Sequence, residues 1–128
     1  MTDYDLVVLG AGATGLGAAR SARKAGRSVA LIEPERPGGD CTHFGCVPSK
    51  AMLETARRVH AARSGSVYGF EANPKVDFGA VMKRVHAVIG DIERDESPAP
   101  LASEGTDLHP GAGIVAGDDT ARLAGRTV

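Results

Sequence analysis

Net charge, long apolar runs and cysteine are all scarce in this 128-residue sequence. The formal net charge is −1 and acidic and basic residues are interspersed, which excludes the basic surface expected of a protein that binds nucleic acid or an anionic membrane. No apolar run is long enough to span a bilayer, and the short apolar stretch behind the acidic N-terminus does not have the form of a signal peptide. We therefore expect a cytoplasmic protein whose partners are neither nucleic acid nor membrane.

The only two cysteines, Cys41 and Cys46, either pair with each other or act as two free thiols. A regular helix would hold them too far apart for a disulfide, so pairing requires a bend in the segment. Gly45 gives the backbone the necessary freedom, and Pro48 is typical of the first turn of a helix. Cys46 is therefore predicted at a helix N-terminus, where the dipole and free N–H groups favour a thiolate and lower the pKa of the sulfur. The alternatives are incidental thiols or a metal site, and we expect no metal because there is no second cysteine pair.

A glycine-rich segment precedes the cysteines. Gly10, Gly12 and Gly15 follow an apolar run at residues 6–9 and open a helix-like stretch, and Glu33 closes a second apolar run. This is the context of a dinucleotide-binding fingerprint, in which the glycines allow a tight turn, close approach of a pyrophosphate and close packing of helix on strand. Glu33 can hydrogen-bond a ribose hydroxyl, and an acid suits a free ribose better than a 2′-phosphate. The alternative is a purely structural glycine turn, which the surrounding pattern makes less favoured.

Together with the glycine motif and Glu33, residues 38–50 resemble the pyridine nucleotide-disulfide oxidoreductases of the FAD-containing class. That class includes lipoamide dehydrogenase, mercuric reductase and glutathione reductase, and residues 46–51 are closest in wording to the first two. The resemblance implies a Rossmann-like α/β FAD-binding domain with a parallel sheet and flanking helices. It also implies FAD as cofactor, NAD(P)H as co-substrate, a small disulfide or metal-ion substrate, and a homodimer for the full-length protein. Electrons would pass from nicotinamide through flavin to a Cys41–Cys46 disulfide and then to substrate, or by the same route reversed.

The resemblance also implies a role for individual residues. Cys46 would lie beside the flavin as the charge-transfer thiolate, and Cys41 would be the interchange thiol that attacks the substrate. Lys50 matches a lysine that lies close to the flavin in the lipoamide dehydrogenase branch. The full set of implied cofactor-binding residues is Gly10, Gly12, Ala13, Thr14, Gly15, Glu33, Pro34, Gly39, Asp40, Cys46 and Lys50.

The chain departs from the family pattern at two places. Asp40 stands where the family usually has threonine, and its carboxylate would repel a pyrophosphate unless it points away or caps the following helix. Residues 42–44 replace the commoner aliphatic-asparagine-aliphatic filling between the cysteines. His43, between the two sulfurs, is interpreted as a solvent-facing or hydrogen-bonded loop residue in preference to an acid or base, because the family's base comes from elsewhere.

Hydrophobic periodicity predicts strands at about residues 4–9 and 28–33 and helices at about residues 14–25, 46–63 and 78–96. Asp77 is the expected N-cap of the last helix, its charged tail at 91–96 is expected to be solvated, and Pro98 and Pro100 are expected to end it. Its expected buried face comprises Val81, Met82, Val85, Val88, Ile89 and Ile92. After it, Leu108, Ile114, Val115 and residues 121–128 predict the start of a small β-meander, whose turn is the cluster Gly117, Asp118 and Asp119.

A chain of 128 residues has room for one compact domain, whereas the family it resembles spans well over three times that length. The sequence contains no second glycine motif for a nicotinamide nucleotide and no C-terminal dimerisation domain with the base that serves Cys41. We therefore expect residues 1–128 to be a truncated N-terminal part of a FAD-binding domain that is not competent by itself. Two other interpretations stay open: a nucleotide-binding module with unpaired thiols, and an inactive truncated remnant.

Overall fold

Three parallel strands form the centre of the fold. The computed structural model describes residues 3–117, 120–123 and 126–127. The strands lie in the order β1-β2-β3 and have the bounds Leu6–Leu9, Val29–Glu33 and Thr106–Pro110. Leu6 pairs with Val29, and Val29 with Thr106. The predicted parallel α/β fold is confirmed. Residues 29–32 of the central strand β2 are all buried, which accounts for their continuously apolar sequence.

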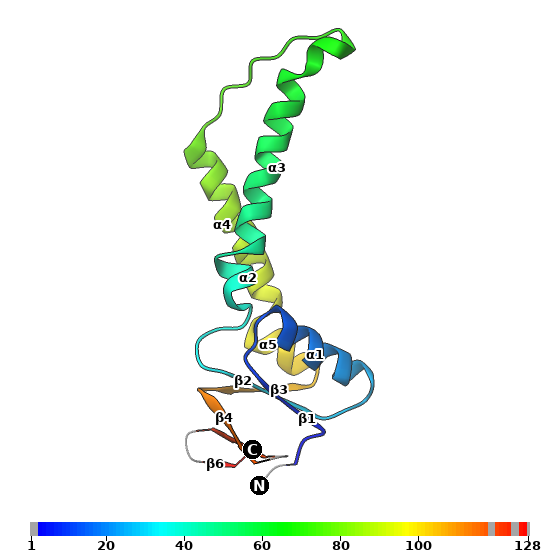
Figure 1. Ribbon diagram of the computed structural model, residues 1–128, viewed down its shortest axis with the longest axis vertical. Coiled ribbons are helices and arrows are strands. Elements are labelled where there is room, and N and C mark those ends of the chain that lie inside the picture. The colour runs from blue at the N-terminus through cyan, green and yellow to red at the C-terminus, as the bar shows by residue number, and fades with distance from the viewer. Residues whose placement is uncertain (1–2, 118–119, 124–125, 128) are drawn as a thin grey trace.

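Two helices cover one face of this sheet, α1 at Ala13–Lys24 and α5 at Pro98–Ser103 (Figure 1). The core between helices and sheet is formed by Ala11, Leu16, Leu31 and Leu101, with Val8 and Leu108 packed against it. Helix α5 differs from the prediction that Pro98 and Pro100 only end the preceding helix. Pro98 occupies the first helical position, where its missing N–H is not needed, so the same residue that stops one helix starts the next.

A long helical hairpin projects from the sheet (Figure 1). Its elements are α2 at Gly39–His43, α3 at Cys46–Arg63, the short 3-10 helix η1 at Gly65–Tyr68, and α4 at Phe78–Asp95. Helix α3 has the predicted bounds, and the Asp77 carboxylate caps α4 by accepting a hydrogen bond from the Ala80 N–H at 3.1 Å. Of the predicted buried face of α4, Val85 is fully buried and the other five residues are half-buried. The buried face of α4 is narrow because α4 packs mainly against α3, and α3 mainly against α4.

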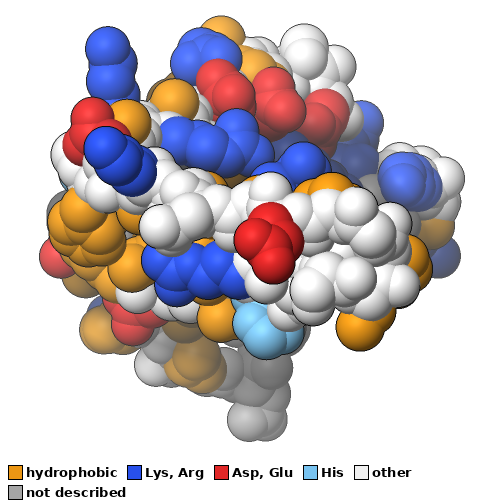
Figure 2. Space-filling view, turned by 90° about the horizontal axis from the view of Figure 1, so that it is seen from above, with side chains coloured by type: hydrophobic (Ala, Val, Ile, Leu, Met, Phe, Trp, Pro, Cys, Tyr) orange, Lys and Arg blue, Asp and Glu red, His pale blue; other side chains and the backbone are white. Residues whose placement is uncertain are grey.

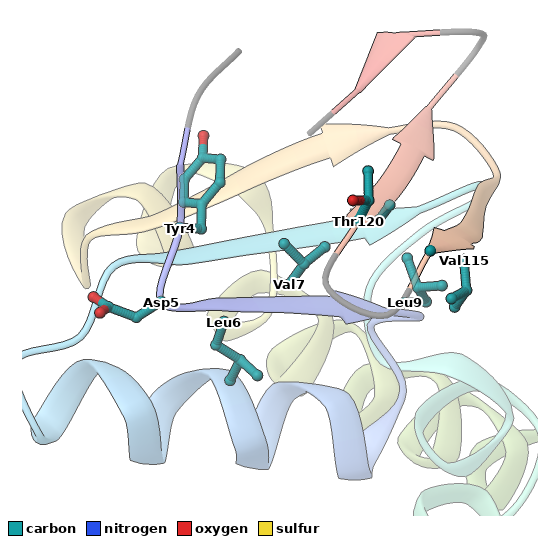
Figure 3. Close-up of a pocket in the computed structure, with 9 residues that line it drawn as sticks. Tyr4, Asp5, Leu6, Val7, Leu9, Val115 and Thr120 are labelled. Carbon is teal, nitrogen blue, oxygen red and sulfur yellow. The ribbon is translucent and has the colours of Figure 1, made fainter.

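A small antiparallel sheet lies on the other side of the main sheet. Its strands are β4 at Gly113–Gly117, β5 at Thr120–Leu123 and β6 at Arg126–Thr127. These strands confirm the predicted β-meander, while the predicted turn residues Asp118 and Asp119 lie outside the described residues. Leu108 was wrongly assigned to the meander, because β3 pairs in parallel with β2 and belongs to the main sheet. The β4–β5 hairpin faces β1 across a hollow of about 320 Å³, which Figure 3 shows with its lining residues.

The surface carries charges of both signs. Figure 2 shows acidic, basic and hydrophobic side chains mixed on the end of the molecule that is uppermost in Figure 1. The most exposed large hydrophobic side chains, Val67 and Tyr68, belong to η1 and are 80% and 83% exposed. Among the helices that the structure describes, none is both long enough and apolar enough to cross a membrane.

Tyr4, just before β1, is tied to the far edge of the main sheet. Its hydroxyl donates a hydrogen bond to the Asp107 carboxylate and lies 3.2 Å from Nε2 of His109, both on β3. The hydrogen bond to Asp107, together with partial burial and the negative charge of that carboxylate, raises the pKa of Tyr4 to about 12. The neutral phenol is therefore favoured by the fold.

We expect the stability of the protein to fall as the pH rises from the ordinary tyrosine pKa of about 10 through the raised value, because the unfolded chain loses the Tyr4 proton first. In a Tyr68→Phe variant, Tyr4 is the one remaining tyrosine and its titration can be followed by tyrosinate absorbance. Adding Asp107→Asn to that variant should return the Tyr4 pKa toward its ordinary value. An unchanged titration in the double variant would contradict the assigned cause.

Candidate functional site

The glycine segment forms a tight turn between β1 and α1. Gly10 has a φ of +95°, which only glycine adopts without strain, and its N–H donates to the Ile32 carbonyl at 2.8 Å. A Cβ built on Gly15 would lie 1.9 Å from the Gly10 carbonyl oxygen, so helix and strand approach as closely as glycine permits. A Cβ on Gly12, in contrast, would meet none of the described atoms within 4 Å. The turn is therefore packed on its Gly15 side and open on its Gly12 side.

Helix α1 begins at this turn with its N-terminus unprotected. Gly12 is its N-cap, and no side chain among the described residues accepts a hydrogen bond from the first-turn N–H groups. Ala13 and Thr14, which follow, are exposed. Free N–H groups and the positive end of a helix dipole form a general binding place for phosphate.

Glu33 ends β2 beside the same turn. One of its carboxylate oxygens accepts the Ala11 N–H at 2.7 Å and the other accepts the Glu35 N–H at 2.9 Å. The side chain is half-buried and Pro34 next to it is exposed. Each carboxylate oxygen has a second lone pair, so Glu33 can accept further hydrogen bonds in this position.

Backbone contacts join the glycine turn to the cysteine segment. The Gly38 N–H donates to the Ala11 carbonyl at 2.8 Å, and Gly12 and Gly38 form an isolated parallel bridge. A Cβ on Gly39 would lie 3.0 Å from the Cα of Gly12. Gly38 and Gly39 have φ values of +103° and +57°. The glycine turn and the cysteine segment can therefore approach closely, because Gly38 and Gly39 have no side chains that would collide. Both residues also adopt positive φ values without strain.

The two cysteines lie on different helices. Cys41 is in the short helix α2, and Cys46 is the first residue of α3, as predicted. The chain bends between them at Phe44 and Gly45, where a Cβ on Gly45 would lie 3.0 Å from the Asp40 carbonyl oxygen. Both are free thiols, Cys46 exposed and Cys41 half-exposed.

The titration of Cys41 depends on Cys46. The pKa of Cys41 is raised, first by a hydrogen bond to the Cys46 side chain, then by burial and by the charge of Cys46. The Cys46 backbone N–H and the Lys50 ammonium act in the opposite direction, which places both near the Cys41 sulfur. Cys41 therefore keeps its proton to a higher pH than an isolated thiol, and the pair is close enough for one sulfur to respond to the other.

Asp40 lies in the first turn of α2 with its side chain exposed. The N-cap of α2 is Gly38 and that of α3 is Gly45, and neither helix receives a side-chain cap from the described residues. Of the two arrangements expected for the carboxylate, capping of the following helix is therefore wrong. The exposed position leaves the carboxylate free to point toward solvent.

His43 differs from the expectation of a solvent-facing loop residue, because it is 7% exposed and ends α2. It is hydrogen-bonded, as the other part of that expectation required: Nε2 donates to the Pro37 carbonyl at 2.9 Å, since a carbonyl oxygen can only accept. Nδ1 is buried and has no partner in the described part of the chain. His43 is therefore a buried, hydrogen-bonded residue of α2.

Glu96 is the residue of this region that the sequence pattern does not reveal. It follows α4, is half-buried instead of solvated, and accepts a hydrogen bond from the Thr42 hydroxyl at 3.0 Å. Nothing local in the sequence links it with Thr42. Over the described residues, no group of three or more His, Cys, Asp or Glu side chains is arranged to hold a metal ion.

A mostly apolar groove of about 370 Å³ begins at Cys46 and runs between α3 and α4. Two cations, Lys50 and Arg84, belong to its lining. The remaining lining residues are Val47, Ala51, Val88 and Ile92. One of the two thiols is therefore accessible from a groove large enough for a planar organic group.

The site therefore combines the ends of parallel strands, an uncapped glycine turn and an adjacent pair of thiols. The family model for pyridine nucleotide-disulphide oxidoreductases matches residues 4–125, and the chain belongs to that family. The chain is 41% identical over 105 residues to a mercuric reductase of Streptomyces lividans, covering 80% of this chain and 22% of that protein.

Two other relatives are named for different reactions. A dihydrolipoyl dehydrogenase of Bacillus subtilis is 42% identical over 89 residues, which covers 69% of this chain and 19% of the relative. A soluble pyridine nucleotide transhydrogenase of Pseudomonas putida is 35% identical over 123 residues, covering 94% of this chain and 26% of the relative. The chain thus spans about a fifth to a quarter of the length of the curated relatives it matches.

We expect Gly15→Ala to destabilise the protein by about 3 kcal/mol or more, because the new methyl group would overlap a backbone oxygen that cannot move without displacing β1. The matched control is Gly17→Ala on the same helix, where a Cβ meets no described atom within 4 Å. This substitution should stabilise the protein by about 0.5–1 kcal/mol, because alanine favours a helix more than glycine does. Urea unfolding of both variants measures the difference. Equal stabilities would contradict the close approach at Gly15.

We expect Cys46→Ala to lower the pKa of Cys41 toward its ordinary value, because the neighbouring sulfur is the main cause of the increase. The measurement is the rate of Cys41 alkylation by iodoacetamide against pH, resolved by mass spectrometry. Its half-maximal rate should move to lower pH in the variant. A profile that stays in place would show that the two thiols do not interact.

Proposed function

We propose that this chain forms the FAD-binding and redox-disulfide part of an oxidoreductase that passes electrons between NAD(P)H and a small disulfide or a metal ion. The observation that carries the proposal is the junction of Gly12 with Gly38, which sets an open phosphate-binding turn beside a thiol pair. The names of two relatives, mercuric reductase and dihydrolipoyl dehydrogenase, support the substrate classes.

The residues present fit FAD. The space in front of Gly12 is open and the N-terminus of α1 is uncapped, so Gly10, Gly12, Ala13, Thr14 and Gly15 would hold the pyrophosphate. The Glu33 carboxylate and the neighbouring Pro34 would bind the adenosine ribose. When bound, FAD supplies a centre that accepts two electrons from a nicotinamide and passes them to sulfur.

The thiol segment would meet the flavin end of the cofactor. Gly39, Asp40, Cys46 and Lys50 are the residues we assign there. The Lys50 ammonium acts on the Cys41 sulfur, and it also lines the groove that opens at Cys46. A positive charge at this point favours negative charge on nearby sulfur or on an electron-rich ring.

Thiol–disulfide exchange accounts for the sulfur chemistry. The Cys41 thiolate attacks a sulfur of the substrate disulfide, which releases one substrate thiolate and leaves a mixed disulfide on Cys41. The Cys46 thiolate then attacks the Cys41 sulfur, which closes the Cys41–Cys46 bond and releases the second substrate thiolate. Because the pKa of Cys41 is raised, the first step needs a base, which we expect from outside the described residues.

The second candidate function is hydride transfer between two pyridine nucleotides. The relative named for that reaction matches more of this chain than the other two. Hydride transfer between nucleotides requires no protein thiol, so under this function Cys41 and Cys46 would be dispensable. Their mutual contact favours the disulfide reaction.

Several features of the whole protein remain predictions. We place the nicotinamide-binding and dimerisation domains outside residues 1–128, and expect the homodimer and the cytoplasmic location that the resemblance and the sequence indicate. The isolated chain is expected to be incompetent for turnover. Cofactor binding and thiol oxidation are therefore the properties to measure.

We expect Gly12→Ala to weaken FAD binding about tenfold, because its methyl group enters the space that a phosphate would use. The apoprotein should lose no more than about 1 kcal/mol of stability, since the methyl group touches no described atom and alanine is only a poorer N-cap than glycine. The measurement is visible absorbance of flavin retained after gel filtration, together with urea unfolding without FAD. Gly17→Ala is the matched control and should bind FAD like the wild type.

A free-thiol count before and after mild reduction accompanies this measurement. Retained flavin with two thiols released on reduction supports the proposed function. A reducible bridge without retained flavin means that residues beyond this chain complete the FAD site. Two permanently free thiols would refute the disulfide reaction and favour a nucleotide-binding module.

A further inference from the structure

The end of α4 contacts three separate parts of the site. The Glu96 carboxylate accepts from Thr42 of α2 at 3.0 Å. Glu93 forms an ion pair with Arg36 at 3.3 Å, and Arg36 in turn lies 5.9 Å from the ring centre of Phe44 in the bend between the cysteines. The Asp95 carbonyl accepts from the Arg20 guanidinium of α1 at 3.2 Å.

The contacts of Glu96 and Thr42 converge on Gly38. A Cβ on Gly38 would lie 2.6 Å from Oε2 of Glu96, 2.8 Å from the Cβ of Thr42 and 3.0 Å from Nε2 of His43. Gly38 is also the residue that bridges to Gly12 of the phosphate-binding turn. Glu96 therefore closes over the point where the nucleotide turn and the thiol segment meet.

Helix α2 depends on these contacts for its position. It has five residues, too few to be stable without tertiary support, and no described side chain caps it. The two buried polar side chains of α2 each make a hydrogen bond to the rest of the fold: Thr42 donates to Glu96, and His43 donates to the Pro37 carbonyl. Cys41 precedes Thr42 directly in α2, so a contact that restrains the backbone at Thr42 also restrains the backbone at Cys41.

We propose that Glu96, acting through Thr42, is a positioning residue for the thiol pair: it holds α2 so that Cys41 stays in contact with Cys46. The inference deepens the proposed function and rests on it, since the Glu96–Thr42 hydrogen bond matters here because it favours formation of the Cys41–Cys46 disulfide. Neither Glu96 nor Thr42 touches a reacting sulfur. Their effect is on the effective concentration of one thiol at the other.

Equilibration with glutathione measures that effective concentration. As the Cys41–Cys46 bond forms, two electrons and two protons leave the thiols and one glutathione disulfide takes them up as two glutathione molecules. The ratio of oxidised to reduced protein at known glutathione ratios gives the equilibrium constant. Urea unfolding of each variant shows that the folded chain is being compared.

We expect Thr42→Val and Glu96→Ala each to lower the equilibrium constant for disulfide formation about fivefold, the effect of losing one hydrogen bond. The double variant should lose no more than either single variant, because both remove the same contact. Thr42→Ser keeps the hydroxyl and Glu96→Gln keeps an acceptor oxygen, so both should return the constant toward the wild-type value.

Asp91→Ala is the matched control, because it removes a negative charge from the exposed side of α4, where Asp91 is paired, among the described residues, with Arg94 of the same helix. It should leave the constant unchanged. Wild-type constants in Thr42→Val and Glu96→Ala would overturn the inference, as would an equal decrease in Asp91→Ala. Should Glu96→Ala fail to fold, the isosteric Thr42→Val carries the same test.

A second measurement separates failure of this inference from failure of the proposed function. A wild-type chain that forms no disulfide under any glutathione ratio would contradict the proposed function. In that case the Cys41 alkylation profile still reports the contact with Cys46. A profile that moves to lower pH in Thr42→Val supports the positioning role, and an unmoved profile overturns it.

Discussion

The backbone junction between Gly12 and Gly38 is the constraint on which the site depends. It places the end of β1, the start of α1 and the segment that carries Cys41 within one short stretch of space. A side chain at Gly38 would collide with three neighbours, and one at Gly39 would press on Gly12. The positive φ values of both residues add a second reason for glycine. The glycine turn and the segment with the two thiols can lie side by side only because these positions have no Cβ.

Local signals in the sequence were sufficient for the elements they border. The bounds of α3 follow from Gly45 and Pro48 at its start, and the cap of α4 follows from Asp77. The role of β3 could not be read in the same way, because its parallel partner β2 lies far away in the sequence and no turn signal joins them. Residues that meet only through the fold, such as Thr42 and Glu96, leave no pattern at all.

The motifs of the candidate site are visible in the sequence, whereas the burial of the residues around them is not. Glycine spacing, Glu33 and the cysteine pair have a fixed order along the chain, so a sequence displays them directly. Burial depends on what covers a residue, and that is where expectation and structure differ: His43 is enclosed, whereas most of the expected apolar face of α4 is half-exposed. The difference from the usual family sequence at residues 42–44 can be explained only from the contacts that α2 makes in the structure.

The position of β1 has a consequence for how this chain meets other polypeptides. Within the described residues β1 pairs with β2 on one side, so its other side forms the edge of the main sheet. Edge strands present unpaired N–H and C=O groups that can receive another strand. The edge here is four apolar residues long, with Asp5 at its start as the adjacent charge. An edge of only four residues limits how many hydrogen bonds a further strand could form with it.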